Sequence, residues 1–389
     1  MRDAVIVEAV RTPVGKGKPN GALAGIHPVE LLSHALRTLV ERGGIDPGLI
    51  DDVIGGTVDQ VGEQAMNTTR YAWLGAGLPE SVPATTVDRQ CGSSQQAVHF
   101  AAQGVMAGAY DAVVACGVES MSRVPMWSNV PPGADPFGPG VSERYAEGLV
   151  PQGISAELIA AKWSIGREAM DAYAVSSHQR AAQAWADGLF DAEVAPIGGL
   201  TMDESVRPGT TPEVLAGLRP SFENPAFAER FPQIEWSVTA GNSSPVNDGA
   251  SAVLITSAEL AERLGLRPLA RLHSFAVTGS DPLLMLTGVL PATEKVLKRA
   301  GLRLDDIDLF EVNEAFASVV LAWLQETGAD PAKLNVNGGA LAIGHPLGAS
   351  GTRLMTTLVH AMRARGARYG LQTMCEAGGL ANATILEAL

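Results

Sequence analysis

Residues Asn335–Arg353 read NVNGGALAIGHPLGASGTR and place one histidine, His345, in a segment with five glycines. Backbone this rich in glycine, with Pro346 directly after the histidine, does not form a regular helix, so we expect a tight loop. From Ala349 onward, apolar residues recur at three- and four-residue steps, which predicts a helix. A glycine-rich turn that leads into a helix brings backbone N–H groups close to a ligand. The stretch therefore predicts a loop that presents His345 to a reaction centre.

Segments rich in β-branched residues alternate with helical segments on both sides of this stretch. We expect strands at 4–10, 50–58, 81–87, 112–115, 252–256, 269–275 and 307–312. Helices are expected at 28–40, 92–105, 164–186, 291–300 and 315–324. This alternation predicts an α/β fold with a parallel sheet covered by helices on both faces.

The second half of the chain repeats the first half in outline. On this pattern Asn313 occupies the strand-to-helix corner that Cys91 occupies in the first half. Two doubly wound halves would meet with these corners facing a shared crevice. Between the halves the proline-rich and loop-rich character of the chain predicts an insertion that covers a pocket. We expect an N-terminal half at 1–118 and 240–265, an inserted loop domain at 119–239 and a C-terminal half at 266–389.

The composition excludes several classes of partner. The 389 residues are 46% hydrophobic, the formal net charge is −14 and the sequence pI is about 5.0. Such a surface repels phosphate backbones and anionic lipid, so neither nucleic acid nor membrane is an expected partner. No apolar run approaches the ~20 residues of a membrane span.

The cysteines and the chain ends indicate a location. An odd count of three cysteines in a long chain argues against a disulfide framework and fits a reducing compartment. The first residues enter a strand pattern at once, without the pattern of a signal peptide, and the last residues carry no peroxisomal address. We expect a cytoplasmic protein.

Two cysteines and one histidine are the candidates for chemistry. A free cysteine usually fills the core, and Cys116 inside an apolar strand keeps that interpretation. Cys91 instead stands at a strand-to-helix corner, where a helix N-terminus would favour its thiolate. Cys375 lies on a turn followed by two glycines. A pair formed by Cys91 and His345 generates a nucleophile, and a second thiol could move a proton to or from carbon.

Other kinds of site lack their motifs. No C-x-x-C or H-E-x-x-H occurs, so we expect no metal site. Gly339 to Gly344 has P-loop spacing, but His345 and Pro346 replace the required Lys and Ser/Thr. No G-x-G-x-x-G follows the first strand, so a dinucleotide cofactor is not expected.

Six stretches together resemble the thiolase family, in family order and over nearly the whole chain. They are VDRQCGSSQQAV around Cys91, ACGVESMS at 115–122, TAGNSSPVNDGA from Thr239, VNEAFA around Asn313, the glycine-rich stretch around His345 and MCEAGG around Cys375. The resemblance implies two βαβαβαββ halves in a five-layered α/β/α/β/α core with an inserted loop domain. It also implies a homodimer or a homotetramer built from two dimers.

The resemblance further implies roles for individual residues. Cys91 is similar to the acylated nucleophile, His345 to its base, and Cys375 to the acid/base for the carbanion. Asn313 resembles the residue that holds a catalytic water, which with His345 forms one oxyanion hole. A second hole would use the backbone N–H groups of Cys91 and Ala377. The remaining carried-over positions are Ser244, similar to a residue at the pantetheine arm of CoA, and Arg207, near its nucleotide end.

The implied activity is that of an acyltransferase, a 3-ketoacyl-CoA thiolase that uses CoA as a substrate and needs no cofactor. The family usually has glycine in place of Ala377, for which we expect an ordinary φ, and often glycine in place of Pro245. Short-chain biosynthetic members carry a His–Met pair where this chain has Pro151–Gln152. This departure favours a degradative enzyme with medium or bulky acyl chains. The alternatives are a biosynthetic acetoacetyl-CoA thiolase and an inactive thiolase-like lipid-binding protein.

Overall fold

The computed structural model describes residues 2–389 and consists of strands and helices in alternating order. The first half contributes β1 (Ala4–Arg11), β3 (Asp52–Gly56), β4 (Ala84–Val87), β5 (Ala112–Ser120) and β6 (Asn247–Ser257), with the short β2 (Gly15–Lys16) beside β6. The second half contributes β7 (Ala270–Gly279), β8 (Leu309–Val312), β9 (Tyr369–Glu376) and β10 (Leu380–Ala388). These elements confirm the α/β class and all seven predicted strands, and they add β2, β9 and β10.

The strands follow the order β4-β3-β5-β6-β1 in the first half and β7-β10-β9-β8 in the second. The halves meet edge to edge, since β1 and β7 pair antiparallel at Val5 with Arg271 and at Ile6 with Ala270. Within each half, parallel pairing (β3 with β4 and β5, β8 with β9) is followed by an antiparallel final strand. Both halves therefore have the same topology.

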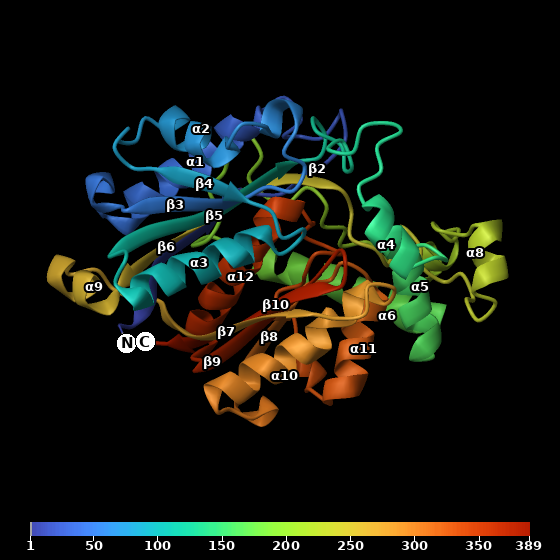
Figure 1. Ribbon diagram of the computed structural model, residues 1–389. Helices are drawn as coiled ribbons and strands as arrows, with labels where there is room; N and C mark the ends of the chain where they lie inside the picture. The colour runs from blue at the N-terminus through green and yellow to red at the C-terminus, as the bar shows by residue number, and fades with distance from the viewer. Residues whose placement is uncertain (1) are drawn as a thin grey trace.

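Five layers result from the way helices cover these strands (Figure 1). α1 (Pro28–Gly43) and α2 (Thr68–Gly75) cover the outer face of the first half, and α10 (Val289–Ala300) and α11 (Ala317–Thr327) cover that of the second. α3 (Ser93–Ala107) and α12 (Ser350–Arg365) pack against each other between the two sets of strands. Three separate apolar clusters fill the spaces between the layers, so each layer is stabilised by hydrophobic burial on the faces it shares.

The predicted equivalence of Asn313 and Cys91 is wrong. With the short β2 set aside, Cys91 follows β4, the third strand of its half, whereas Asn313 follows β8, the second strand of its half. The third-strand position of the second half is taken by Leu334, which forms a single parallel bridge with Phe310. The loop after Leu334 contains His345 and leads into α12. His345 is therefore the residue on the loop equivalent to the corner of Cys91, and only the strand order reveals this.

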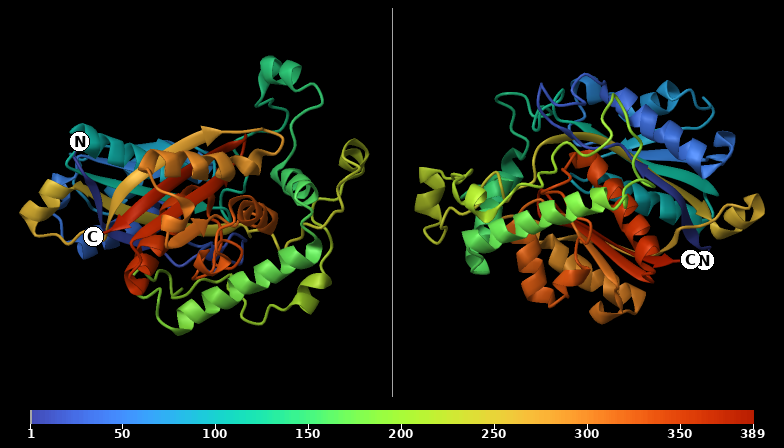
Figure 2. Two further views of the ribbon diagram at one scale, coloured as in Figure 1. Left: turned by 90° about the horizontal axis from the view of Figure 1, so that it is seen from below. Right: turned by 180° about the vertical axis from the view of Figure 1, so that it is seen from behind.

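The segment between β5 and β6 adds helices and no strand to the layers. It contains α4 (Gly138–Arg144), α5 (Gln152–Lys162), α6 (Arg167–Ala186), α7 (Pro212–Ala216) and α8 (Pro225–Arg230). Figure 2 shows α4 and α8 projecting from the layered core, while the long α6 runs along it. The short α9 (Ala258–Leu264) connects β6 to the second half. The domain boundaries given above stay a prediction.

None of the helices in residues 2–389 combines the length and the apolar character that a bilayer crossing requires.

Candidate active site

Cys91 lies at a corner of strained backbone between β4 and α3. The residue before it, Gln90, has a φ of +50°, which is uncommon for a side chain other than glycine and marks a shaped turn. The hydroxyl of Ser93 donates to the carbonyl of Gln90 (2.6 Å) and accepts from the amide of Arg89 (2.9 Å), which holds the turn. Gly92 then caps α3. The corner thus presents a nearly buried sulfur at the start of a helix.

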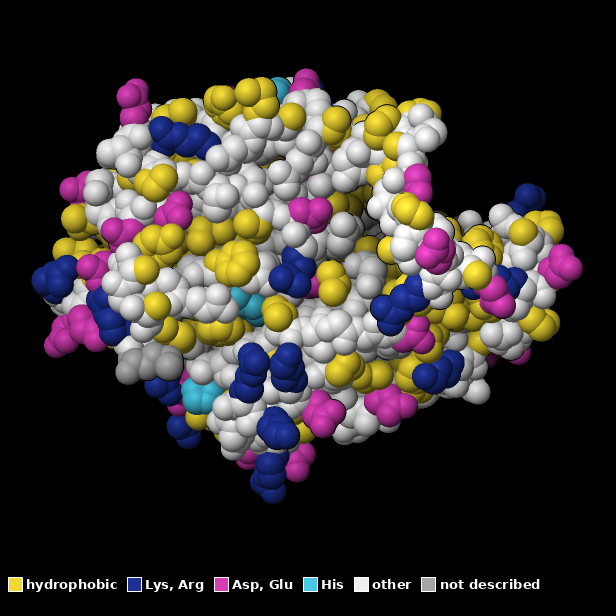
Figure 3. All heavy atoms as spheres, viewed as in Figure 1, with side chains coloured by type: hydrophobic (Ala, Val, Ile, Leu, Met, Phe, Trp, Pro, Cys, Tyr) yellow, Lys and Arg dark blue, Asp and Glu magenta, His cyan; other side chains and the backbone are white. Residues whose placement is uncertain are grey.

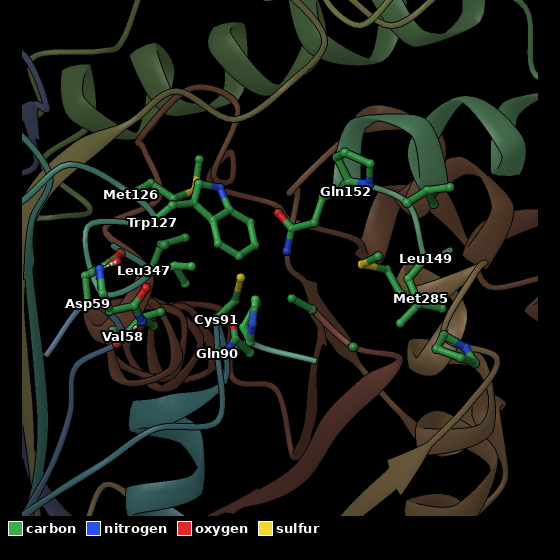
Figure 4. A pocket seen from close by; sticks show the side chains of 18 of the residues that line it. Val58, Asp59, Gln90, Cys91, Met126, Trp127, Leu149, Gln152, Met285 and Leu347 are labelled. Atoms are coloured by element: carbon green, nitrogen blue, oxygen red, sulfur yellow. Dashed lines mark hydrogen bonds between the residues drawn. The ribbon is translucent and has the colours of Figure 1, made fainter. Parts of the chain in front are cut away.

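A cavity of about 590 Å³ opens in front of Cys91 (Figure 4). Its wall is mostly apolar, and the segment between β5 and α5 supplies much of it. The apolar side chains on the wall are Val58, Met126, Trp127, Val130, Phe137, Leu149, Val150, Met285 and Leu347. Figure 3 shows hydrophobic side chains around a hollow between the layered core and the segment that carries α4. A cavity of this size and lining is typical of a site for a largely apolar small molecule.

Hydrogen bonds fix both the backbone and the ring of His345. Its amide donates to Oδ1 of Asn247 (2.9 Å), and Asn247 in turn donates to the carbonyl of Gly15. Its Nδ1 lies 2.6 Å from Oγ of Ser350, whose single hydroxyl proton goes to the carbonyl of Pro346 (2.8 Å). Nδ1 must therefore donate to Ser350, which leaves Nε2 unprotonated. Within residues 2–389, Nε2 has no hydrogen-bond partner.

Glu119 ties the loop of His345 to the cavity wall. Its carboxylate accepts from the amides of Gly348 (2.8 Å), Val58 (2.9 Å) and Asp59 (3.1 Å), and from Nε2 of Gln64 (2.7 Å). Burial raises the pKa of Glu119 from 4.5 to about 7, and these four donors oppose that rise. The contact is possible because Gly117, two residues earlier, leaves room for the carbonyl of Gly348.

Cys375 lies on β9, and Asn313 directly follows the neighbouring strand β8. The turn predicted for Cys375 is wrong, because this residue is fully buried within β9, where it pairs with Ala381. The amide of Asn313 donates to the carbonyl of Thr373 (3.0 Å) on β9. Asn313 is also fully buried, and among residues 2–389 neither atom of its carboxamide finds a partner. A buried amide without partners costs stability, so its retention indicates a ligand or an ordered water.

The three segments come together around one apolar cluster. Cys91, Leu347 (two residues after His345) and Met374 (one residue before Cys375) pack against each other there. Burial is the largest cause that raises the pKa of the Cys375 thiol, and the charge of Cys91 is the next. The structure thus brings together segments more than 200 residues apart, as the paired-halves arrangement predicted.

Ala377 has an ordinary backbone φ, which confirms the expectation, and the two glycines that follow take the positive values of 80° and 79°. Ala377 lines the cavity together with Cys91. Within residues 2–389, no acceptor pairs with the backbone amide of either residue. Two free donors on one cavity wall are suited to stabilise a developing oxyanion.

The charge states differ from the expectation for Cys91. Burial, followed by the charge of Glu376, raises the pKa of Cys91 to about 12, so these outweigh the helix N-terminus that was expected to favour the thiolate. Burial and the nearby Arg353 lower the pKa of His345 to about 3. At neutral pH the site therefore holds a neutral thiol and a neutral imidazole. A thiol in this state must lose its proton to a base before or during any nucleophilic attack.

Ser244 and Arg207 do not line this cavity. Ser244 is half-buried, and its amide donates to the carbonyl of Ala315 (2.9 Å), close to Asn313. Arg207 is exposed, and its amide donates to Nδ1 of His178 (3.2 Å). Their predicted contacts with CoA stay a prediction.

Sequence reasoning assigned no site role to Glu119, Asn247, Ser350 or Gln152. Glu119 and Asn247 lie within stretches quoted for the resemblance, but nothing in the residue types shows that they hold the His345 loop. Ser350 could have been considered from its five-residue spacing to His345 at the start of a helix. Gln152 was noted only as a departure from a family pattern, and its position beside Cys91 depends on how α5 packs.

Comparison with known proteins agrees with the fold. Residues 4–259 match the N-terminal domain of thiolase, and residues 266–388 match its C-terminal domain. The chain is 48% identical to a steroid 3-ketoacyl-CoA thiolase of Mycobacterium tuberculosis, covering 100% of this chain and 95% of that protein. It is 42% identical to a 3-ketoacyl-CoA thiolase of Bacillus subtilis, with 100% of both covered.

Two solved structures are similar over the whole chain. Human mitochondrial 3-ketoacyl-CoA thiolase in complex with CoA superposes with a TM-score of 0.89 at 37% identity, covering 100% of this chain and 98% of that one. The acetyl-CoA acetyltransferase of Bacillus anthracis superposes with a TM-score of 0.88 at 37% identity, covering 100% and 99%.

Proposed function

The chain belongs to the thiolase family, and from this premise we propose that it is a degradative acyltransferase that cleaves 3-ketoacyl-CoA with CoA. The products are acetyl-CoA and an acyl-CoA shortened by two carbons. Of the three cysteines, Cys91 alone lines the cavity, and Nε2 of His345, two residues before the cavity-lining Leu347, has a free lone pair. That arrangement of thiol, base and cavity is the observation that carries the proposal.

In the first half-reaction Cys91 attacks the 3-keto carbon while its proton passes to Nε2 of His345. The C2–C3 bond then breaks, which leaves the acyl group on the sulfur and an acetyl-CoA enolate. Cys375 protonates the enolate carbon and becomes a thiolate. The oxyanion on the 3-keto oxygen is stabilised by fixed donors, each worth roughly 3–4 kcal/mol.

In the second half-reaction the thiol of CoA gives its proton to Cys375 and attacks the thioester on Cys91. The sulfur of Cys91 leaves and recovers its proton from His345, so both thiols and the imidazole return to their starting states. The amides of Cys91 and Ala377 are the donors for the 3-keto oxygen, which becomes the thioester oxygen of the acyl group on Cys91. Asn313, with a bound water, and His345 serve the thioester oxygen of the acetyl-CoA enolate. Ser244 and Arg207 contact CoA.

The acyl chain is of medium length or bulky. The cavity of about 590 Å³ supports this, because most of its wall is apolar and because Cys91, which carries the acyl group, lines it. The relative from Mycobacterium tuberculosis is a steroid 3-ketoacyl-CoA thiolase. CoA is a substrate, the enzyme needs no further cofactor, and it works in the cytoplasm as a homodimer or homotetramer.

Two measurements test the function. Mass spectrometry of the protein mixed with a 3-ketoacyl-CoA shows an acyl adduct on Cys91, and Cys91→Ser prevents the adduct. An unmodified wild-type protein would instead indicate a lipid-binding protein without activity. The ratio kcat/KM is then compared for acetoacetyl-CoA and for longer or ring-bearing 3-ketoacyl-CoA. A clear preference for acetoacetyl-CoA would favour a biosynthetic thiolase.

A further inference from the structure

Gln152 lies directly opposite the nucleophilic sulfur. It is the first residue of α5 and lines the same cavity as Cys91. In Figure 4 its carboxamide points from the start of α5 toward Cys91, between the side of the wall with Trp127 and the side with Leu149 and Met285. Its carboxamide carries two N–H donors.

The start of α5 is fixed, so the direction of Gln152 is not accidental. A Cβ at Gly153 would lie 2.2 Å from the ring of Phe222, so the helix start packs tightly against this ring. Glu157, one turn later, accepts from the amides of Ser237 (3.0 Å) and Val238 (2.8 Å). Such anchoring reduces the entropy lost when the carboxamide meets a partner.

Few other groups around the sulfur stabilise a thiolate. Its close neighbours in the cluster are apolar, namely Val58, Met121, Leu347, Leu354 and Met374. The carboxylates of Glu376 and Glu119 both raise the pKa of Cys91, whereas a side-chain hydrogen bond from Gln152 and the backbone amide of Cys91 itself lower it. A hydrogen bond to a charged sulfur is stronger than one to a neutral thiol, so its effect is largest on the thiolate.

We propose that Gln152 is a further catalytic residue whose carboxamide donates a hydrogen bond to Sγ of Cys91 and stabilises the thiolate. The thiolate forms when the thiol proton passes to His345 and forms again when the thioester breaks. No bond to Gln152 is made or broken, and its protons stay on the amide. Gln152 thereby offsets the rise in the pKa of Cys91 that burial and the nearby carboxylates cause. The sulfur must ionise twice in each catalytic cycle.

The test measures the thiol itself. The rate of alkylation of Cys91 by iodoacetamide is followed as a function of pH by peptide mass spectrometry, which separates Cys91 from Cys116 and Cys375. Gln152→Met keeps the volume of the side chain without its donors, and we expect alkylation at a given pH to slow roughly tenfold, with the pKa of Cys91 correspondingly higher. Gln152→Glu adds a carboxylate that repels the thiolate, so its alkylation is slower still at neutral pH.

The matched control is Gln103→Met, the same chemical change at an exposed position of α3. It leaves the alkylation profile of Cys91 at the wild-type values. Equal profiles for wild type, Gln152→Met and Gln152→Glu would overturn the proposal, because a residue that only packs the cavity does not shift the pKa of the thiol. In steady state, Gln152→Met lowers kcat more than it raises KM, since the interaction forms only with the thiolate.

The inference rests on the proposed role of Cys91 as nucleophile, but the two can fail separately. A wild-type protein without thiolysis whose alkylation profile still shifts in Gln152→Met would reject the function and keep the contact. An active enzyme whose alkylation profile is the same in the wild type and in Gln152→Met would keep the function and reject the contact.

Discussion

Nδ1 of His345 lies 2.6 Å from Oγ of Ser350, and the hydroxyl of Ser350 donates its proton to the carbonyl of Pro346. This pair selects the imidazole tautomer that has its free lone pair on Nε2. Loss of the hydroxyl would allow either tautomer and a looser ring. The hydroxyl of Ser350 therefore decides whether His345 can act as a base.

Ser350→Ala tests this relationship. We expect kcat to fall roughly 10- to 100-fold with little change in KM, because general-base catalysis weakens while substrate contacts remain. Steady-state kinetics with a 3-ketoacyl-CoA measures it. Ser350→Thr keeps a hydroxyl at the same atom and should recover part of the rate. A kcat for Ser350→Ala equal to that of the wild type would show that the contact is only structural.

Asn313 should show opposite effects on activity and stability. Its carboxamide is buried without partners in residues 2–389. Asn313→Leu therefore replaces an unsatisfied polar group with an apolar side chain of similar volume. We expect the free energy of unfolding to stay constant or rise, while kcat falls roughly 100- to 1,000-fold through loss of an oxyanion-hole donor. Urea unfolding and kinetics on the same preparation measure both. A parallel loss of stability and activity would argue against a functional amide.

Glu119 should make stability depend on pH. The native state holds its proton up to about pH 7, whereas the unfolded chain releases it near the ordinary pKa of 4.5. Between these values the native state binds more protons, so the free energy of unfolding decreases as the pH rises, by up to about 3 kcal/mol. Glu119→Gln cannot titrate and lacks this component. Urea unfolding of both proteins across this range measures the difference, and superimposable pH profiles would contradict it.

Gly117 should be intolerant of a side chain. A Cβ at this position would lie 2.2 Å from the carbonyl oxygen of Gly348 and 2.9 Å from Cα of Ala349, both in the backbone that follows His345. Gly117→Ala must displace that loop, and we expect a loss of about 1–3 kcal/mol in stability together with a lower kcat. Gly25→Ala, where a Cβ would meet nothing within 4 Å, is the control for thermal unfolding and kinetics. Similar results for the two variants would refute the assigned packing.

Much of the fold follows from local pattern. The apolar run of β1 and the periodic face of α1 predict their own structures, because burial on one side of a strand or helix imposes its spacing on the sequence. The corner at Cys91 could be predicted for the same reason, since strand signals end before it and helix signals begin after it. Gly344, with φ of +119°, shows why glycine was needed in the loop of His345.

The sequence by itself determined most of the strands and helices, the corner thiol of Cys91 and the glycine-rich loop, because these depend on neighbours along the chain. Tertiary structure alone decided that His345, not Asn313, lies on the loop equivalent to the corner of Cys91, since strand order is set by packing between distant segments. It also decided that Glu119 meets the amide of Gly348 across 229 residues of chain and that Gln152 faces Cys91. Burial sets the charge of both reacting groups, and burial exists only once the layers have assembled.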